Sequence, residues 1–163
     1  MIRSKIDRRG FFGLTLASGA ALASFSKASF AAGRAFRVQH TPAQWKQLLG
    51  PQRYHILREA GTERAFTSPL LKEHRKGVFV CAGCAQPLFA SATKFESGTG
   101  WPSFWKVLPG ATLSRADHSL GTERTEILCA RCGGHLGHVF NDGPKPTGLR
   151  YCMNGLALKF RPA

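Results

Sequence analysis

The pattern of hydrophobic and polar positions predicts helices in the part of the chain before Gly61. The sequence Thr-Pro-Ala-Gln at 41–44 offers an N-cap hydroxyl, a proline at the first helical position and a capping-box glutamine. We therefore expect a helix that runs to about Leu49 and is ended by the Gly-Pro pair that follows. A second short helix is expected over residues 52–60, with its apolar side chains largely on one side, and Gly61 ends it.

Beyond this point the hydrophobic positions fall into short runs separated by Gly, Pro, Asp and Asn. Runs of this length and spacing are typical of strands in a mainly β, antiparallel fold. The predicted strands are residues 77–80, 87–90, 125–128, 138–140, 150–153 and 157–160. At 163 residues and 43% hydrophobic content the chain can bury one proper core, so we expect a single domain over 41–163.

The first 31 residues have the pattern of an export signal. Basic residues, including the pair Arg8 and Arg9, precede an uncharged stretch over 10–26, and small residues follow at the positions that signal peptidase reads. An arginine pair before a mildly apolar stretch resembles a twin-arginine signal. The uncharged stretch is shorter than the ~20 apolar residues of a membrane span, which favours cleavage over a retained anchor. We expect a cleaved signal over 1–31, a flexible tail over 32–40, and export to a bacterial periplasm without stable membrane insertion.

The chain is strongly basic, with a formal net charge of +14. Residues 1–31 hold five basic residues and one acid, so removing their net charge of +4 leaves +10. A positive surface can attract acidic partners or anionic membranes, but it equally keeps an exported protein soluble. We favour the second interpretation and expect no nucleic-acid partner.

Four of the five cysteines form two Cys-x-x-Cys pairs, each after a strand-like run. Four thiolates about 2.3 Å from a metal ion make a tetrahedral zinc site, and a two-residue gap lets both sulfurs of a pair face one point. The alternative is a disulfide oxidoreductase with two redox-active pairs, but such motifs usually lie at a helix start in a βαβ unit, and this pattern has none. We expect one structural Zn²⁺ per chain, which joins two distant hairpins and is held by Cys81, Cys84, Cys129 and Cys132.

The fifth cysteine, Cys152, is left unpaired. Arg150 and Asn154 lie two residues to either side, so on an extended strand the three side chains share one polar face. A lone cysteine is usually a buried, inert thiol with apolar neighbours, whereas a nearby cation lowers the thiol pKa and favours the nucleophilic thiolate. His135 and His138 alone would be ordinary structural residues, but beside a reactive cysteine they become candidate acids that protonate an oxygen.

An aromatic turn over 98–105 carries two tryptophans and a phenylalanine between glycines. Such aromatic residues usually belong to the core, but one exposed above a thiol would form a pocket for a small apolar group.

Together these motifs resemble the methionine-R-sulfoxide reductase B family over about residues 41–160. Several of these motifs are weak alone, but their combination in one order is specific. The matching segments are Gly-Trp-Pro-Ser-Phe at 100–104, Arg-Thr-Glu at 124–126, the two Cys-x-x-Cys pairs, His-Leu-Gly-His-Val-Phe at 135–140, Asp-Gly-Pro at 142–144, Pro-Thr-Gly at 146–148 and Arg-Tyr-Cys-Met-Asn at 150–154.

The resemblance implies two antiparallel β-sheets with flanking N-terminal helices, and a structural zinc remote from the chemistry. It implies that Cys152 attacks the sulfur of a methionine-R-sulfoxide, protein-bound or free, and that methionine and a cysteine sulfenic acid result. We expect a monomer. The other residues implied to serve the reaction are His135 and His138 as proton donors, Arg150 and Asn154 as ordering residues, and Trp101 and Phe140 as substrate-binding residues, Trp101 at the S-methyl group.

Two positions depart from the family pattern. Many members have a cysteine in the Ser-Gly-x-Gly-Trp-Pro segment that attacks the sulfenic acid, but this chain has Thr99 there. With four cysteines assigned to zinc no resolving thiol remains, so we expect an external thiol, such as a thioredoxin-like domain, to reduce Cys152. Gly155 replaces the usual serine, which bears on the hydrogen bonds beside Asn154. The alternative function is a zinc-stabilised binding module, for example for nucleic acid, in which Cys152 is incidental.

Overall fold

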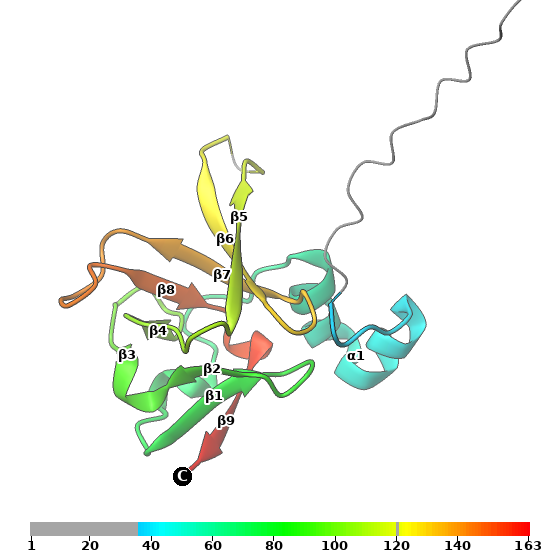
Figure 1. Ribbon diagram of the computed structural model, residues 1–163, viewed down its shortest axis with the longest axis horizontal. Coiled ribbons are helices and arrows are strands. Elements are labelled where there is room, and N and C mark those ends of the chain that lie inside the picture. Colours follow the sequence, from blue (N-terminus) through cyan, green and yellow to red (C-terminus); the bar gives the residue numbers. More distant parts are fainter. Residues whose placement is uncertain (1–35, 120) are drawn as a thin grey trace, which may run out of the picture. The chain divides into compact units, whose positions relative to one another are not determined.

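The computed structural model describes residues 36–119 and 121–163, in which two antiparallel β-sheets and one α-helix form the fold (Figure 1). The expected fold class is therefore confirmed. The expected signal over 1–31 and the first part of the expected tail, 32–35, lie outside the described residues. Within the described ranges, no helix combines the length and the apolar character needed to cross a membrane.

Helix α1 spans Pro42–Glu59 and begins with the predicted capping box. The Thr41 hydroxyl accepts the backbone N–H of Gln44 at 3.2 Å, and the Gln44 side chain accepts the backbone N–H of Thr41 at 2.9 Å. The element contains the two expected helices, which meet at a kink where Gly50 leaves the helical conformation (φ 68°, ψ 171°). The last helical residue is Glu59, and the C-cap is Ala60, which adopts the left-handed conformation. The cap therefore lies one residue before the expected Gly61.

The smaller sheet has three strands in the order β2–β1–β9, and the larger sheet has six in the order β3–β4–β8–β7–β6–β5. All six predicted strands are present, with ends shifted by up to three residues. The strands are β1 Gly77–Cys81, β2 Pro87–Ala90, β3 Lys94–Phe95, β4 Ser103–Phe104, β5 Thr112–Asp117, β6 Arg124–Cys129, β7 His135–Phe140, β8 Arg150–Met153 and β9 Leu158–Pro162. Short 3₁₀ turns lie at Pro69–Lys72, Ser91–Thr93 and Gly155–Ala157.

Three strands were not predicted, each for a physical reason. β3 and β4 have two residues each, which is too short to show a period. β5 is an edge strand with half-exposed or exposed residues throughout, so it lacks the apolar alternation that marks a strand.

The two sheets share a core of phenylalanine rings. Phe79 in β1 and Phe89 in β2 come from the smaller sheet, and Phe104 in β4 comes from the larger one. All three side chains are fully buried. The Phe89 and Phe104 rings stack at a centroid distance of 4.3 Å, and the Phe79 ring meets Phe104 edge-on at 4.9 Å. Because burying one such side chain contributes about 1.5–3 kcal/mol, this cluster stabilises the contact between the sheets.

Strand β7 contains a bulge that decides where its histidines point. Ile127 of β6 pairs with Gly137, but the next residue, Leu128, pairs with His135, so Leu136 is an extra residue in β7. In a regular strand, side chains three positions apart lie on opposite faces. The extra residue restores His135 and His138 to one face.

Gly137 allows β7 to lie close to β8. A Cβ atom at this position would overlap the carbonyl oxygen of Cys152 and lie 3.0 Å from the Cα atom of Met153. The backbone φ of 153° is also one that residues with side chains rarely adopt. The absence of a side chain therefore permits the pairing of His138 with Cys152.

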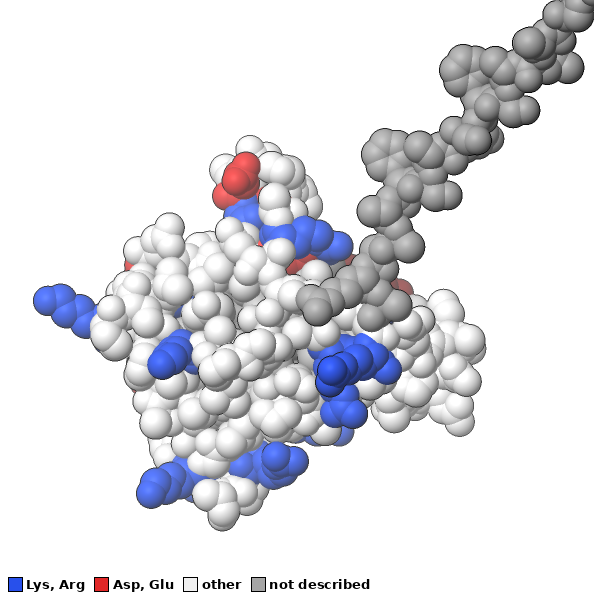
Figure 2. Space-filling model, in the orientation of Figure 1, with Lys and Arg blue, Asp and Glu red and all other residues white. Residues whose placement is uncertain are grey.

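Basic side chains are spread over the surface. On the face shown in Figure 2, Lys and Arg lie in several separate groups, and no continuous basic patch covers that face. Separate groups of this kind are typical of a solvated surface, and the expected absence of a nucleic-acid partner stays a prediction.

Candidate functional site

One row of register partners crosses five strands of the larger sheet. Arg115 pairs with Glu126, Glu126 with His138, His138 with Cys152, and Cys152 with Ser103. Directly paired residues of antiparallel strands point to the same face, so these side chains lie side by side on one face of the sheet. Ser103, which lies 152 − 103 = 49 positions away in the chain, is thereby brought next to Cys152.

A cavity of about 130 Å³ opens beside Cys152. Its size suits the end of a side chain and not a folded partner. Of the residues predicted for the site, five line it and two, His135 and Arg150, do not. The lining residues are Thr62, Trp101, Arg124, Gly137, His138, Phe140, Cys152 and Asn154.

The Cys152 thiol is free and half-buried. Its Sγ atom lies 3.7 Å from the hydroxyl oxygen of Thr99. That hydroxyl is bonded to the Ser97 hydroxyl at 2.9 Å, which in turn is bonded to the Ser103 hydroxyl at 2.8 Å. A chain of three hydroxyl groups therefore ends at the sulfur atom.

Arg150 is held beside the site by an acid and an aromatic ring. Its guanidinium donates two hydrogen bonds to the Asp142 carboxylate, both at 2.8 Å, and stacks 4.4 Å from the centre of the Phe140 ring. Asp142 raises the pKa of Arg150, and the sulfur of Cys152 raises it further. The guanidinium is therefore held in a fixed position beside the cavity.

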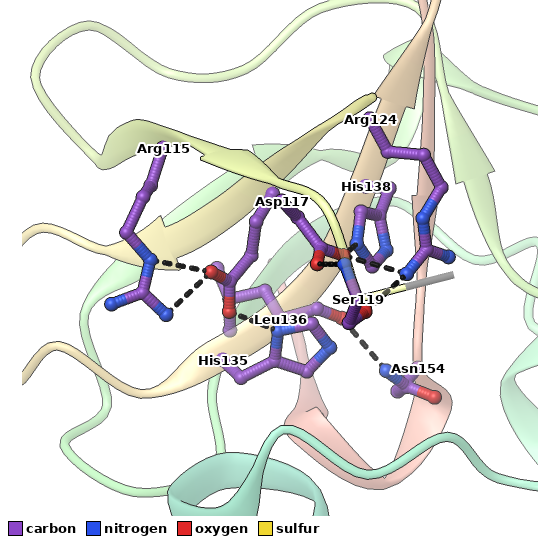
Figure 3. Close-up of polar contacts among 9 residues, drawn as sticks. Arg115, Asp117, Ser119, Arg124, His135, Leu136, His138 and Asn154 are labelled. Atoms are coloured by element: carbon purple, nitrogen blue, oxygen red, sulfur yellow. Dashed lines mark hydrogen bonds and ion pairs between the residues drawn. The ribbon is translucent and has the colours of Figure 1, made fainter. Parts of the chain in front are cut away.

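Each histidine of β7 is bonded to a carboxylate of the β5–β6 hairpin (Figure 3). His135 Nδ1 lies 2.7 Å from the Glu126 carboxylate, and His138 Nε2 lies 2.7 Å from the Asp117 carboxylate. Hydrogen bonds from the backbone and side chain of Ser119, followed by the bond with His138, hold the pKa of Asp117 well below its usual range. Burial lowers the pKa of His135, although Glu126 opposes that shift.

Glu63, which the sequence motifs did not single out, links three parts of the site. Its backbone N–H donates to the side-chain oxygen of Asn154 at 3.0 Å, and its carbonyl accepts the indole N–H of Trp101 at 3.1 Å. Its buried carboxylate accepts the backbone N–H groups of Gly155 and Leu156. Burial raises the pKa of Glu63, and those two hydrogen bonds oppose the shift. No local pattern marks this residue, because its partners lie 38 to 93 positions away.

The four remaining cysteines converge on one point. Their sulfur atoms all lie within 4.8 Å of one another, with Cys81 3.7 Å from Cys132 and Cys84 3.5 Å from Cys129. Four sulfurs at 2.3 Å from a central ion lie about 3.8 Å apart, so the cluster fits a tetrahedral metal site. Cys81 belongs to β1 and Cys129 to β6, so the site joins the two sheets.

The fold and the cavity define a β-sheet protein with a free cysteine thiol in a small cavity. The family model described as SelR domain matches residues 49–162. "Peptide methionine sulfoxide reductase MsrB" of Leptospira interrogans is 57% identical over 127 residues, which are 77% of this chain and 97% of that protein. The protein of that name from Agrobacterium fabrum is 55% identical over 127 residues, which are 77% of this chain and 94% of that protein. The one from Thiobacillus denitrificans is 56% identical over 123 residues, which are 75% of this chain and 93% of that protein. The chain therefore belongs to the SelR-domain family of MsrB proteins, as its motifs indicated.

Gly155, which stands where the family usually has serine, packs against the side chain of Ser68. A Cβ atom at position 155 would overlap the Ser68 hydroxyl, which itself caps a 3₁₀ turn by accepting the backbone N–H of Leu70 at 3.2 Å. Gly155 and Ser68 therefore fill one space between them.

We expect Gly155→Ser alone to destabilise the protein by about 2 kcal/mol through overpacking. Ser68→Gly should cost only about a few tenths of a kcal/mol through the lost cap, because glycine is itself tolerated at N-cap positions. The double variant should lose less than the two single losses together, because the glycine at 68 makes room for the serine at 155. Urea unfolding of the four proteins measures this, and strictly additive losses would contradict the shared space.

Proposed function

We propose that this protein reduces the R epimer of methionine sulfoxide to methionine, with Cys152 as the nucleophile. Membership of the SelR-domain family and the names of its relatives support the activity. The observation that carries the assignment is the free Cys152 thiol in one small cavity with the Trp101 indole and His138. That combination provides a nucleophile, an apolar wall and a proton carrier.

In the chemical step, the Cys152 sulfur attacks the sulfoxide sulfur and its thiol proton passes to the sulfoxide oxygen. His138 lines the cavity and is the residue that carries this proton. The oxygen leaves with the Cys152 sulfur as a sulfenic acid, and methionine is released. Cys152 is oxidised by two electrons and the substrate sulfur is reduced by two, so thiol and sulfoxide balance sulfenic acid and thioether.

Trp101 and Phe140 bind the substrate side chain in this proposal. Both line the cavity, and their ring faces suit the S-methyl group. The indole N–H of Trp101 is bonded to the Glu63 carbonyl, which fixes the ring orientation before substrate arrives. Stacking of Arg150 on Phe140 fixes the second ring in the same way.

The second half of the cycle requires a thiol from outside the chain. Thr99 occupies the position next to the Cys152 sulfur, and the other four cysteines are clustered together. Two thiols of an external reductant, such as a thioredoxin-like domain, would convert the sulfenic acid to thiol and water and become a disulfide.

The four-cysteine cluster would hold a Zn²⁺ ion. Its four thiols and their near-tetrahedral spacing suit zinc, and four protein ligands leave no open position for catalysis. Bound zinc would supply a charge that stabilises the thiolates and a link between β1 and β6.

Substituting Cys152 and a cysteine of the four-cysteine cluster should affect different properties, the first the activity and the second the zinc content and stability. Cys152→Ser should lower the rate of R-sulfoxide reduction by at least ~10³-fold and leave one zinc per chain, because serine is a far weaker nucleophile. Cys84→Ser, the matched control, should lose zinc and unfold at a lower denaturant concentration. Epimer-resolved activity and metal analysis measure both. Turnover by the Cys152→Ser protein would refute the assignment of Cys152 as the nucleophile.

Introducing a thiol at position 99 should convert the cycle to an internal one. Because the Thr99 hydroxyl is 3.7 Å from the Cys152 sulfur, Thr99→Cys should give a disulfide between positions 99 and 152 after one equivalent of substrate. The unchanged protein should instead yield a sulfenic acid that a selective trapping reagent labels at Cys152. Mass spectrometry of peptides tests both, and a disulfide from Cys152 to any clustered cysteine in the unchanged protein would contradict the external reductant.

We also propose that the protein is exported and that residues 1–31 are removed. The curated relatives are covered almost whole by 127 residues of this chain, which leaves room for an added targeting segment. In a bacterial host, the periplasmic protein should have the mass of a chain beginning near residue 32, and Arg8→Lys with Arg9→Lys should keep it in the cytoplasm. A full-length mass in the periplasm would contradict cleavage.

A further inference from the structure

The pair formed by Glu126 and His135 is among the most buried polar contacts of the site. The two side chains are 5% and 4% exposed, and their atoms meet at 2.7 Å. The second oxygen of Glu126 accepts a hydrogen bond from Arg115 Nε at 2.8 Å and forms an ion pair with Arg115 Nη2 at 2.6 Å. The carboxylate is therefore held between a guanidinium and an imidazole (Figure 3).

This arrangement decides which nitrogen of His135 carries the proton. An ionised carboxylate only accepts hydrogen bonds, so Nδ1 must be the protonated nitrogen. Burial lowers the pKa of His135, which keeps the ring neutral and leaves Nε2 without a proton. Nε2 is buried and has no hydrogen-bond partner within the described part of the chain.

The neighbouring histidine is held by its other nitrogen. His138 is bonded to Asp117 through Nε2, and the Asp117 oxygen also accepts a hydrogen bond from Arg124 at 2.6 Å. The two rings meet edge to face with centroids 5.5 Å apart. Two similar side chains of one strand thus hold their protons at different nitrogens, and only His138 lines the cavity.

We propose that Glu126 is a positioning residue of the reaction, which holds His135 as a neutral ring with its proton on Nδ1 and its Nε2 lone pair free to accept a hydrogen bond. This inference rests on the proposed reduction. His135 then holds the neighbouring His138 ring, which it meets edge to face, and is not itself an acid. His138 carries the proton between the Cys152 thiol and the sulfoxide oxygen. Glu126 acts on the chemistry only through His135.

Glu126→Gln gives a sharp test because the amide has one acceptor and one donor. The N–H groups of the Arg115 guanidinium, at 2.8 and 2.6 Å, favour placing the amide oxygen toward Arg115, which turns the amide NH₂ toward His135. Nδ1 must then lose its proton and Nε2 must gain it. The ring of His138, bound to Asp117, should keep its state.

The matched control is Glu59→Gln. Glu59 forms the same kind of pair with His55, at 3.0 Å, but on the exposed surface of α1. The conservative variant Glu126→Asp retains a carboxylate and should retain the Nδ1 proton of His135, whether or not its shorter reach lowers the rate.

Ring-nitrogen chemical shifts of ¹⁵N-histidine-labelled protein report each tautomer, and steady-state kinetics with methionine-R-sulfoxide report the reaction. We expect Glu126→Gln to move the His135 proton to Nε2 and to lower kcat by about 10- to 100-fold, with KM changed less than twofold. Glu59→Gln should change neither. An unmoved His135 proton, an unchanged kcat, or a rise in KM alone would overturn the proposal.

The two proposals fail in different ways. An unchanged protein that reduces neither epimer would overturn the proposed function and the kinetic half of this inference. The nuclear magnetic resonance measurement does not depend on turnover, so it still decides whether Glu126 sets the proton position on His135.

Discussion

The structure depends on the meeting of four sulfur atoms at one point between two sheets. Cys81 ends the central strand of the smaller sheet, and Cys129 ends a strand inside the larger one. A metal ion bound there would act as a cross-link between segments far apart in the chain, and so restrict the unfolded chain far more than a local contact does. The phenylalanine core also lies between the two sheets that such a link would join.

The hydrogen-bonded register of the larger sheet positions the side chains around the cavity. Paired residues of neighbouring strands carry the site from Arg115 at one edge to Ser103, so its geometry is set by backbone bonds and not by flexible loops. Two local features adjust that row. The bulge at Leu136 brings a second histidine to the same face, and Gly137 lets β7 approach β8.

The features that the sequence predicted correctly are those that depend on local hydrophobic pattern or on cysteine spacing. Six strands, the capping box, the metal-type cluster and the free Cys152 follow from short-range signals. The carboxylates that hold the histidines do not, because Asp117 lies 21 positions before its partner on an exposed strand without apolar alternation. Glu63 is missed for the same reason, and it reaches Trp101 and Asn154 through its backbone, which no side-chain motif reveals.

The positions of the last two strands constrain how the chain can be made. β9 pairs with β1, the central strand of the smaller sheet, and β8 lies between β4 and β7 inside the larger one. Neither sheet can close until these final segments have left the ribosome. The earlier strands must wait with unpaired edges, which are open to pairing with other chains. Cys152, on β8, therefore reaches the cavity among the last parts of the molecule to be synthesised.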